Sequence, residues 1–304
     1  MRQLAYRLAL ALCAATLVLM LVGGLVTHTG AALAVPDWPT TFGYNMFLFP
    51  WSKMVGGILY EHSHRLLGAA VGLVTIALAA TLWLSEGRRW LRWLGVAAVI
   101  AVSVQGVLGG LRVVLVEDAI AIVHGALAQA FFALAVSMAL VTSPSWATAA
   151  PARSPDAVLL RRLVLLTTGV VYFQIVFGAF LTHFGARLDG HLLGAAALAV
   201  LIPALALRIR RGHGDKPALV LPARFLLALL VVQLLLGFGA YAGRFTDLVL
   251  PLAPFSGLAF PVTHRLVGGL LLAASLVLTL RCHCLLAPPE RGVARDLVSR
   301  EVAA

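Results

Sequence analysis

Apolar residues fall along the chain in long uninterrupted runs, and short segments that carry most of the charged residues separate them. The runs are roughly 17 to 23 residues long, which is the length of a helix that crosses a bilayer. We therefore expect each run to form one membrane-spanning helix. The eight predicted spans are Leu8 to Val26, Leu66 to Leu84, Trp93 to Leu111, Ala119 to Val141, Leu163 to Thr182, His191 to Leu207, Phe225 to Ala242 and Val262 to Leu280. This pattern predicts an all-α polytopic membrane protein.

The composition agrees with this prediction. The chain has 304 residues, of which 61% are hydrophobic and 12% charged, with a mean hydropathy of +0.98. A soluble domain carries about 25% charged residues, so a soluble globular protein is excluded. The net charge of +11 does not indicate nucleic acid binding, because the basic residues lie between apolar runs rather than on one exposed face. Three cysteines, Cys13, Cys282 and Cys284, cannot form a disulfide framework.

The basic residues predict the orientation of the chain in the bilayer. With a cytoplasmic N-terminus, 17 of the 23 Lys and Arg residues fall in cytoplasmic segments. The other six, in outer loops or at outer span ends, are Lys53, Arg65, Arg112, Arg187, Arg244 and Arg265. The positive-inside rule therefore places both termini in the cytoplasm. Residues 1–34 also fit a signal peptide that is cleaved after Ala32-Leu33-Ala34, but the internal repeat favours a span.

The two halves of the chain resemble each other. The segment from Gly23 to Ala31 recurs as Gly178 to Ala186, at an offset of 155 residues. Three further matches are His64 to Ala70 with His191 to Ala197, Gln105 and Gly109 with Gln233 and Gly237, and His124 with His264. Four spans per half predict two tandem, parallel-repeat four-helix bundles. We expect bundles at residues 1–145 and 161–285, a linker at 146–160 and a cytoplasmic tail at 286–304.

The repeat is not uniform. The change in offset between the first two matches places about 28 extra residues in the first outer loop, which runs from about His28 to Tyr60. Turn-forming and interfacial aromatic residues occur in this loop, including Pro36-Asp37-Trp38-Pro39 and Trp51. The first half therefore has a long outer loop that the second half lacks.

One histidine stands near the outer end of each even-numbered span: His64, His124, His191 and His264. Equivalent positions in a duplicated bundle indicate a shared role as ligands rather than four unrelated core histidines. Two imidazoles per half suit heme iron, which takes axial ligands from opposite faces of a flat macrocycle. Zinc would require three or four converging ligands. We predict that His64 faces His124, and that His191 faces His264.

The two predicted sites differ in charge. Glu61 lies one helical turn before His64, and the matching position in the second half is Leu188. An ionisable group inside a membrane is usually functional, although an interfacial Glu61 that meets only water or an arginine is the alternative. Arg65 and Arg265 each follow a ligand histidine, and either bind heme propionates or extend to the lipid headgroups.

The remaining histidines carry weaker predictions. His28 and His183 are matched by the repeat, and either contact propionates or are solvated loop residues. His62 falls on a different helix face from His64, so we do not expect it to be an axial ligand.

Several of these residues together resemble the heme A synthase (cytochrome oxidase assembly) family. They are Glu61-His62-Ser63-His64-Arg65, Gln105 with Gly109-Gly110, His124, His191, His264-Arg265 and the loop segment Asp37-Trp38-Pro39. The resemblance covers essentially all eight spans. Two loop positions that are cysteines in many bacterial members are Val35 and Thr41 here, and His28 stands where an arginine is usual.

The resemblance implies an enzyme that oxidises the C8 methyl of heme O to the formyl group of heme A. It implies that His64 and His124 flank the substrate heme and that Glu61 is the catalytic carboxylate. It also implies that His191 and His264 bind a heme B cofactor. A bacterial inner-membrane location follows, with a heme O synthase and a membrane electron carrier as candidate partners.

Two other functions fit parts of the pattern. A diheme b-type cytochrome that exchanges electrons with quinol would also use four histidines. Glu61 and the one-sided loop favour the enzyme, because a pure electron carrier would need neither. A transporter built from parallel repeats fits the topology but leaves the four histidines without a role.

Overall fold

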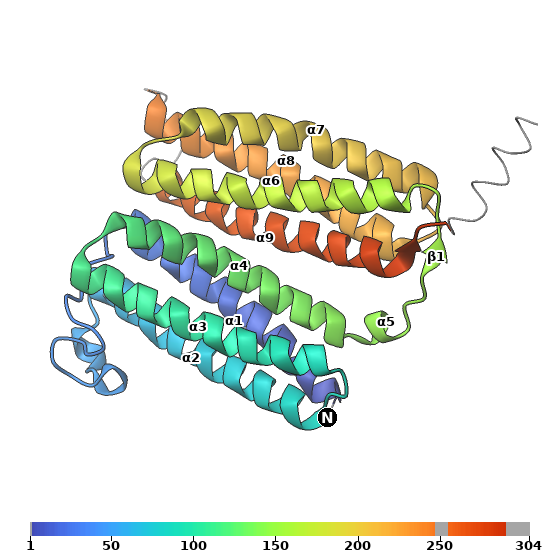
Figure 1. Cartoon of the computed structure of the whole chain (residues 1–304). Helices are drawn as coiled ribbons and strands as arrows, with labels where there is room; N and C mark the ends of the chain where they lie inside the picture. Colours follow the sequence, from blue (N-terminus) through green and yellow to red (C-terminus); the bar gives the residue numbers. More distant parts are fainter. Residues whose placement is uncertain (1, 247–254, 290–304) are drawn as a thin grey trace, which may run out of the picture.

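The computed structural model describes residues 2–246 and 255–289. Long helices make up most of this part of the chain (Figure 1). They are α1 (Arg2–His28), α2 (Gly57–Ser85), α3 (Arg89–Leu115), α4 (Asp118–Thr142), α6 (Ala157–Phe184), α7 (Leu188–Gly212), α8 (Pro217–Phe245) and α9 (Phe255–Leu285). The short elements are η1 (Met46–Leu48), η2 (Trp51–Lys53), α5 (Pro144–Ala147), β1 (Ala152–Arg153) and β2 (Leu286–Ala287).

All eight long helices are long and apolar enough to cross a membrane, so the predicted all-α membrane fold is confirmed. Each helix extends beyond its predicted span, because hydropathy marks only the apolar part while backbone hydrogen bonding continues into the polar interface. Two helices that contain proline, α8 and α9, begin well before the predicted starts at Phe225 and Val262. The chain enters α8 at Pro217, where an N-terminal turn tolerates the missing N–H, and α9 already begins before Pro261.

The helices form two groups of four. In the first group α1, α2, α3 and α4 pack in a ring, and α6, α7, α8 and α9 pack in a second ring with the same order of neighbours. Each ring has its own buried core, one containing Leu78 and Met138 and the other Leu160 and Leu226. This arrangement is consistent with a tandem repeat, and it supports the proposed division into bundles.

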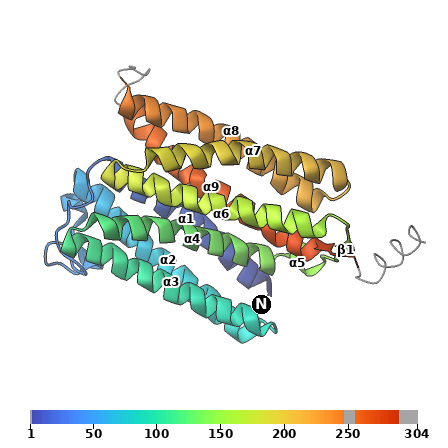
Figure 2. The same ribbon diagram turned by 45° about the horizontal axis from the view of Figure 1, so that its top comes forward.

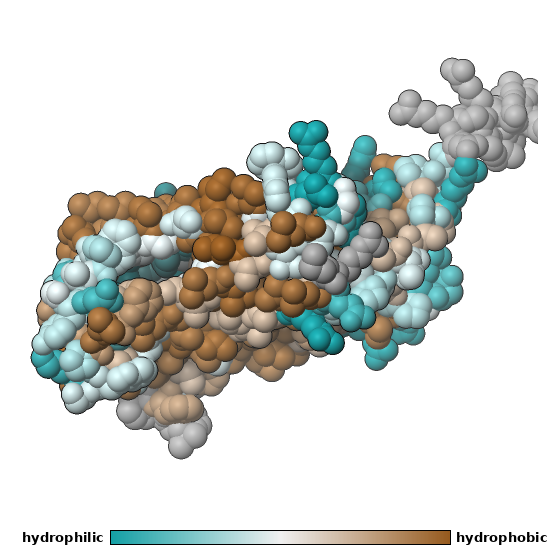
Figure 3. Space-filling view, turned by 90° about the horizontal axis from the view of Figure 1, so that it is seen from below, coloured by the Kyte–Doolittle hydropathy of each residue, from teal (hydrophilic) through white to brown (hydrophobic). Residues whose placement is uncertain are grey.

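The fourth helix of each ring forms the contact between the rings. Helix α9 packs against α4 and α1, and α4 also contacts α6 (Figure 2). For this reason α4 and α9 are the most buried of the eight helices. On the face shown in Figure 3, apolar side chains cover much of the middle of the molecule and hydrophilic residues gather toward its ends.

The start of α1 and the end of α9 lie at the same end of the molecule, and the long first loop lies at the opposite end (Figure 1). An even number of spans requires this arrangement. Which end faces the cytoplasm stays a prediction. Residues 290–304 of the predicted tail and residues 247–254 of the last outer loop lie outside the described residues.

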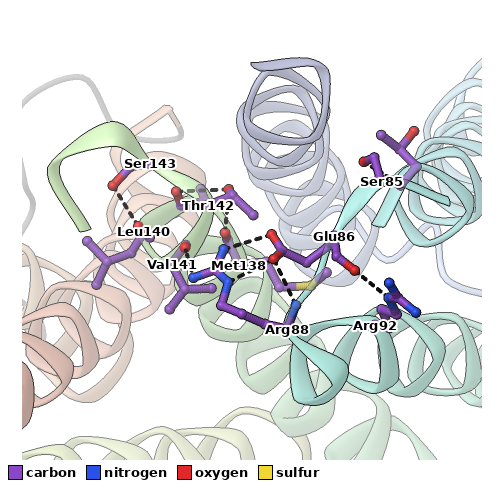
Figure 4. A network of polar contacts seen from close by, with 11 residues as sticks. Ser85, Glu86, Arg88, Arg92, Met138, Leu140, Val141, Thr142 and Ser143 are labelled. Atoms are coloured by element: carbon purple, nitrogen blue, oxygen red, sulfur yellow. Dashed lines mark hydrogen bonds and ion pairs between the residues drawn. The ribbon is translucent and has the colours of Figure 1, made fainter. Parts of the chain in front are cut away.

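Polar contacts hold the helix connections at the end opposite the long loop (Figure 4). The buried Glu86 accepts hydrogen bonds from the side chain of Arg88, and Arg88 Nη1 donates to the carbonyl oxygen of Val141 at 3.1 Å. This joins the α2–α3 turn to the end of α4. The predicted linker is also fixed to the second ring. Its strand β1 pairs in parallel with β2, and β2 directly follows α9 in the chain.

Candidate functional site

Each ring encloses a cavity near the end that carries the long loop. The first cavity has a volume of about 340 Å³, and His64 and His124 both line it. The second has a volume of about 900 Å³, and His191 and His264 line it. Cofactor and ligand pockets in proteins are typically about 300–1,000 Å³. The structure therefore brings the four predicted histidines together in the pairs that the repeat predicts.

All four histidines are packed in the same way against a glycine of the preceding helix. A Cβ atom placed on Gly23, Gly109, Gly178 or Gly237 would lie 2.9–3.3 Å from Cε1 of the nearest histidine. In the same order, the facing residues are His64, His124, His191 and His264. Each imidazole thus packs closely against bare backbone, which leaves it little freedom to rotate.

Hydrogen bonds to the main chain orient the imidazoles of the second cavity. Nδ1 of His191 lies 3.2 Å from the carbonyl oxygen of Gln174, and Nδ1 of His264 lies 3.1 Å from that of Gln233. Because a carbonyl oxygen can only accept, Nδ1 must carry the proton in both residues. Nε2 therefore keeps its lone pair, which is the atom and the tautomer that an axial ligand needs.

The separation of these two rings also fits a shared metal ion. The ring centroids of His191 and His264 are 6.1 Å apart, and their planes are inclined by 66°. Two imidazoles that bind one metal ion from opposite sides, at metal–nitrogen distances of about 2 Å, have centroids roughly 6 Å apart. In the first cavity, the carbonyls of Leu19 and Gln105 lie beside His64 and His124 in the corresponding way. Neither of those Nδ1 atoms makes a hydrogen bond of regular geometry.

Four glutamines with buried side-chain oxygens complete the walls of the cavities: Gln105, Gln129, Gln174 and Gln233. Their side-chain oxygens accept no hydrogen bond from any described residue. A buried acceptor without a donor costs about 1–3 kcal/mol, so these oxygens indicate cavities built to hold a ligand or water. Gln174 was not among the residues predicted from the sequence, although three of the odd-numbered spans share one spacing, a glutamine four residues before the glycine that faces the histidine.

The glycine contacts give a testable prediction. Replacing Gly237 by alanine would place a methyl group 2.9 Å from Cε1 of His264. The methyl group would displace the imidazole from its position in the cavity. We expect the heme affinity of the second cavity to fall about tenfold or more, measured by titrating the purified protein and following the Soret absorbance. Gly169→Ala on α6 is the matched control, because a Cβ there meets nothing within 4 Å. An unchanged affinity in Gly237→Ala would show that the contact does not orient the ligand.

Glu61 lines the first cavity and is held by two strong contacts. One carboxylate oxygen accepts from Nη2 of Arg65 at 2.8 Å, and the other accepts from the backbone N–H of Val35 at 2.9 Å. The side chain is 4% exposed, so this ion pair is shielded from water. Leu188, the counterpart of Glu61 in the repeat, lines the second cavity. At matched positions, the first cavity therefore has a carboxylate and the second has a leucine.

Arg65 also fastens the long loop over the first cavity. Its guanidinium donates to the carbonyl oxygens of Val35, Asp37 and Thr40 in addition to Glu61. Most of its donors are thus committed to the protein, and a contact between Arg65 and a propionate stays a prediction. Trp38 of the loop lines the cavity and lies so close to the backbone of α3 at Gly110 that a side chain there would collide with its ring.

The structure gives His62 a role in holding the loop. It lines neither cavity among the described residues. Its Nδ1 shares a hydrogen bond of 3.1 Å with the hydroxyl of Thr41, and Phe49 packs on its ring at 5.0 Å. Within this segment Glu61, His64 and Arg65 therefore line the cavity, and His62 anchors the loop that covers it.

Asp37 organises the turn within this loop and gives a pH prediction. Burial acts against ionisation of the Asp37 carboxyl, but hydrogen bonds from Gly43, Thr40 and Phe42 outweigh it and lower the pKa to about 2, from 3.8. A lowered folded-state pKa stabilises the turn above about pH 4, and this stabilisation is lost as the pH falls toward 2. We expect the hydrogen-exchange protection of residues 35–44, corrected for intrinsic rates, to be constant above pH 4 and to fall roughly tenfold below it.

Asp37→Asn is the comparison for that measurement. It removes the ionisable group, so its loop protection should already be low at pH 7 and should not change between pH 5 and pH 2. A wild-type protein and an Asp37→Asn variant with the same pH dependence would show that another group controls the turn.

Basic side chains gather where the two cavities approach each other. Arg112 and Arg265 line the first cavity, Arg244 and Arg265 line the second, and His183 lines both. His28 of α1 lines the second cavity, although it belongs to the first ring. The sequence analysis placed Arg112 and Arg244 only by topology, since a single basic residue at a span end is a common interfacial feature.

Parts of the chain match known proteins. A family model described as cytochrome oxidase assembly protein matches residues 50–188. That range includes Glu61 and two of the four cavity histidines, His64 and His124. A heme A synthase from Shouchella clausii is 29% identical over 178 residues, which are 57% of this chain and 57% of the relative. A heme A synthase from Halalkalibacterium halodurans is 27% identical over 180 residues, 56% of this chain and 57% of the relative.

Over these segments the chain is similar to cytochrome oxidase assembly proteins and to heme A synthases. The matched part spans just over half the length of these heme A synthases. The donor set of the two cavities fits heme. Each cavity offers two imidazoles, and no group of three or more His, Cys, Asp or Glu side chains suited to a metal ion occurs in the described part.

Proposed function

We propose that this protein is an oxidoreductase that converts heme O to heme A by oxidising the C8 methyl to a formyl group, in support of cytochrome oxidase assembly. The substrate heme lies in the first cavity between His64 and His124. A heme B cofactor lies in the second cavity between His191 and His264, where it supplies electron transfer. The difference between Glu61 and Leu188 at matched positions of the two cavities supports this division most directly.

The residues of the first cavity have separate tasks in this proposal. His64 and His124 hold the iron of the substrate and so set the depth of the macrocycle. Glu61 presents a buried carboxylate to the methyl that is oxidised, where it stabilises developing positive charge or accepts a proton. Arg65 holds that carboxylate in place, and the loop with Trp38 excludes water from the outer end.

Oxidation of the methyl also requires an electron acceptor. A membrane electron carrier is the proposed partner, and a heme O synthase is the proposed source of substrate. We place the protein in a bacterial inner membrane with both termini in the cytoplasm, because most basic residues then fall on the cytoplasmic side. The cavities then lie near the outer surface.

Co-expression with a heme O synthase, followed by chromatography of the extracted hemes, tests this function. We expect heme A to appear only when both proteins are present. Heme O that accumulates without any oxidised product would contradict the proposal.

The second candidate is a diheme b-type electron carrier that exchanges electrons with quinol. The feature that favours it is the likeness of the two cavities, since all four histidines have the same glycine contact. The same chromatography separates the two functions, because an electron carrier leaves every heme chemically unchanged.

A further inference from the structure

Arg265 belongs to the second ring, but its side chain reaches into the first. It follows His264 on α9 and lines both cavities. Its Nη1 lies 3.4 Å from the hydroxyl of Thr27 on α1. Its Nη2 would lie 2.7 Å from a Cβ atom placed on Gly125 of α4. The guanidinium therefore crosses the contact between the rings and lies against the opposite half.

The repeat shows how room for this crossing arises. Gly125 follows His124 just as Arg265 follows His264, so the two residues are counterparts in the two halves. One half supplies a guanidinium and the other supplies the space that it fills. One turn further along, the roles of the halves are reversed. There the first half supplies the side chain, Gln129 of α4, and the second half supplies the glycine, Gly269 of α9. The contact between the rings thus holds a single arginine that faces both cavities.

This arginine lacks a counter-charge within the described residues. No carboxylate there lies within 4.0 Å of it. Its charged neighbours are basic: Arg112 lies close enough to repel it, and His183 shares both cavities with it. Two acidic side chains lie in this region: Glu61 of the first cavity is paired with Arg65, and Asp118 is exposed and 3.9 Å from His183. Arg265 is half-buried. A cation within a membrane-spanning segment is costly unless it is paired, so this position favours a carboxylate from a ligand.

We propose that Arg265 binds a carboxylate of the heme in each cavity, so that one residue of the second half completes the binding site of the first. The inference rests on the proposed heme-binding function and adds a shared site between the halves. A guanidinium has five N–H donors in a planar fork, which is enough for two carboxylates on its two sides. Within the described residues, Arg265 donates only one hydrogen bond, the long contact with Thr27.

The test measures heme binding one cavity at a time in the full-length protein. His191→Ala leaves the first cavity as the binding site, and His64→Ala leaves the second. Each background is titrated with heme B and with its dimethyl ester, in which both propionates are blocked. We expect Arg265→Gln to lower the affinity for heme B about tenfold or more in both backgrounds, and to change the affinity for the ester less than about twofold.

Two further variants make the result specific. Gly125→Ala keeps the charge but displaces the guanidinium, and it should reproduce the loss of heme B affinity with little effect on the ester. Arg187→Gln removes an exposed cation that lines neither cavity, and it should leave both affinities unchanged. Arg265→Lys keeps the positive charge but lacks the planar guanidinium, and it serves as a control that the protein folds with a substitution at this position.

Three results would overturn the proposal. A loss confined to the His64→Ala background would mean that Arg265 serves only the cavity of its own half. An equal loss for heme B and the ester would mean that it acts on packing rather than on a carboxylate. Failure of both backgrounds to bind heme B with Arg265 intact would overturn the heme-binding function itself, and this proposal with it.

Discussion

Replacing His191 or His264 by alanine is expected to remove the b-type absorption spectrum of the purified protein. Each residue supplies an Nε2 lone pair that a main-chain carbonyl orients from the other side of the ring. Loss of a group that only orients a ligand already costs about 10- to 100-fold in metal affinity, so loss of the ligand itself should cost more. Heme content per protein, measured by the pyridine hemochrome spectrum, should fall accordingly.

The same experiment on the first cavity should have a different result. His64→Ala or His124→Ala should leave the b-type spectrum in place and stop conversion of added heme O. His283→Ala on α9 is the control, because this histidine is exposed and at the opposite end of the helix from His264. Equal loss of both hemes from every single replacement would contradict two separate sites and indicate one coupled site.

Replacing Glu61 by glutamine is expected to stop heme A formation while heme binding persists. The change keeps the size of the side chain and removes its charge, and no histidine ligand is altered. Arg65 retains its three carbonyl partners, so the loop should stay in place. We expect the rate of heme A formation to fall at least about 100-fold, with a hydroxylated intermediate accumulating, because a positioned acid or base typically contributes about 10²–10⁴-fold.

Chromatography of hemes extracted during turnover measures this effect. Glu117→Gln is a matched control, since Glu117 is an exposed carboxylate at the same end of the molecule that does not line the first cavity. Formation of heme A at the wild-type rate by Glu61→Gln would remove this carboxylate from the mechanism. The electron-carrier function would then be favoured.

Much of the architecture could be predicted from the chain alone. The length of the apolar runs determines the number of spans, because the bilayer imposes one length on every crossing helix. The repeat determines which residues are equivalent, and one histidine at the outer end of every even span then leads to two paired sites. The 28 extra residues of the first outer loop likewise show that the halves differ, before any coordinates are considered.

Contacts between helices of different halves could not be predicted in this way. Periodicity along a helix reports which face is buried, but not which residue of another helix lies opposite. His28 belongs to the first ring and lines the second cavity, and only the packing of α1 against α9 decides this. Arg65 is likewise engaged by the loop because the chain folds back over α2.

Arg265 shows the distinction most clearly. The sequence by itself determined that an arginine follows the last ligand histidine and that glycine occupies the matching position in the first half. The tertiary structure decided that the two positions face each other across the contact between the rings, where the missing side chain of Gly125 admits the guanidinium. The reach of a side chain depends on how closely two helix backbones approach, and that distance arises from the packing of all eight helices rather than from any local pattern.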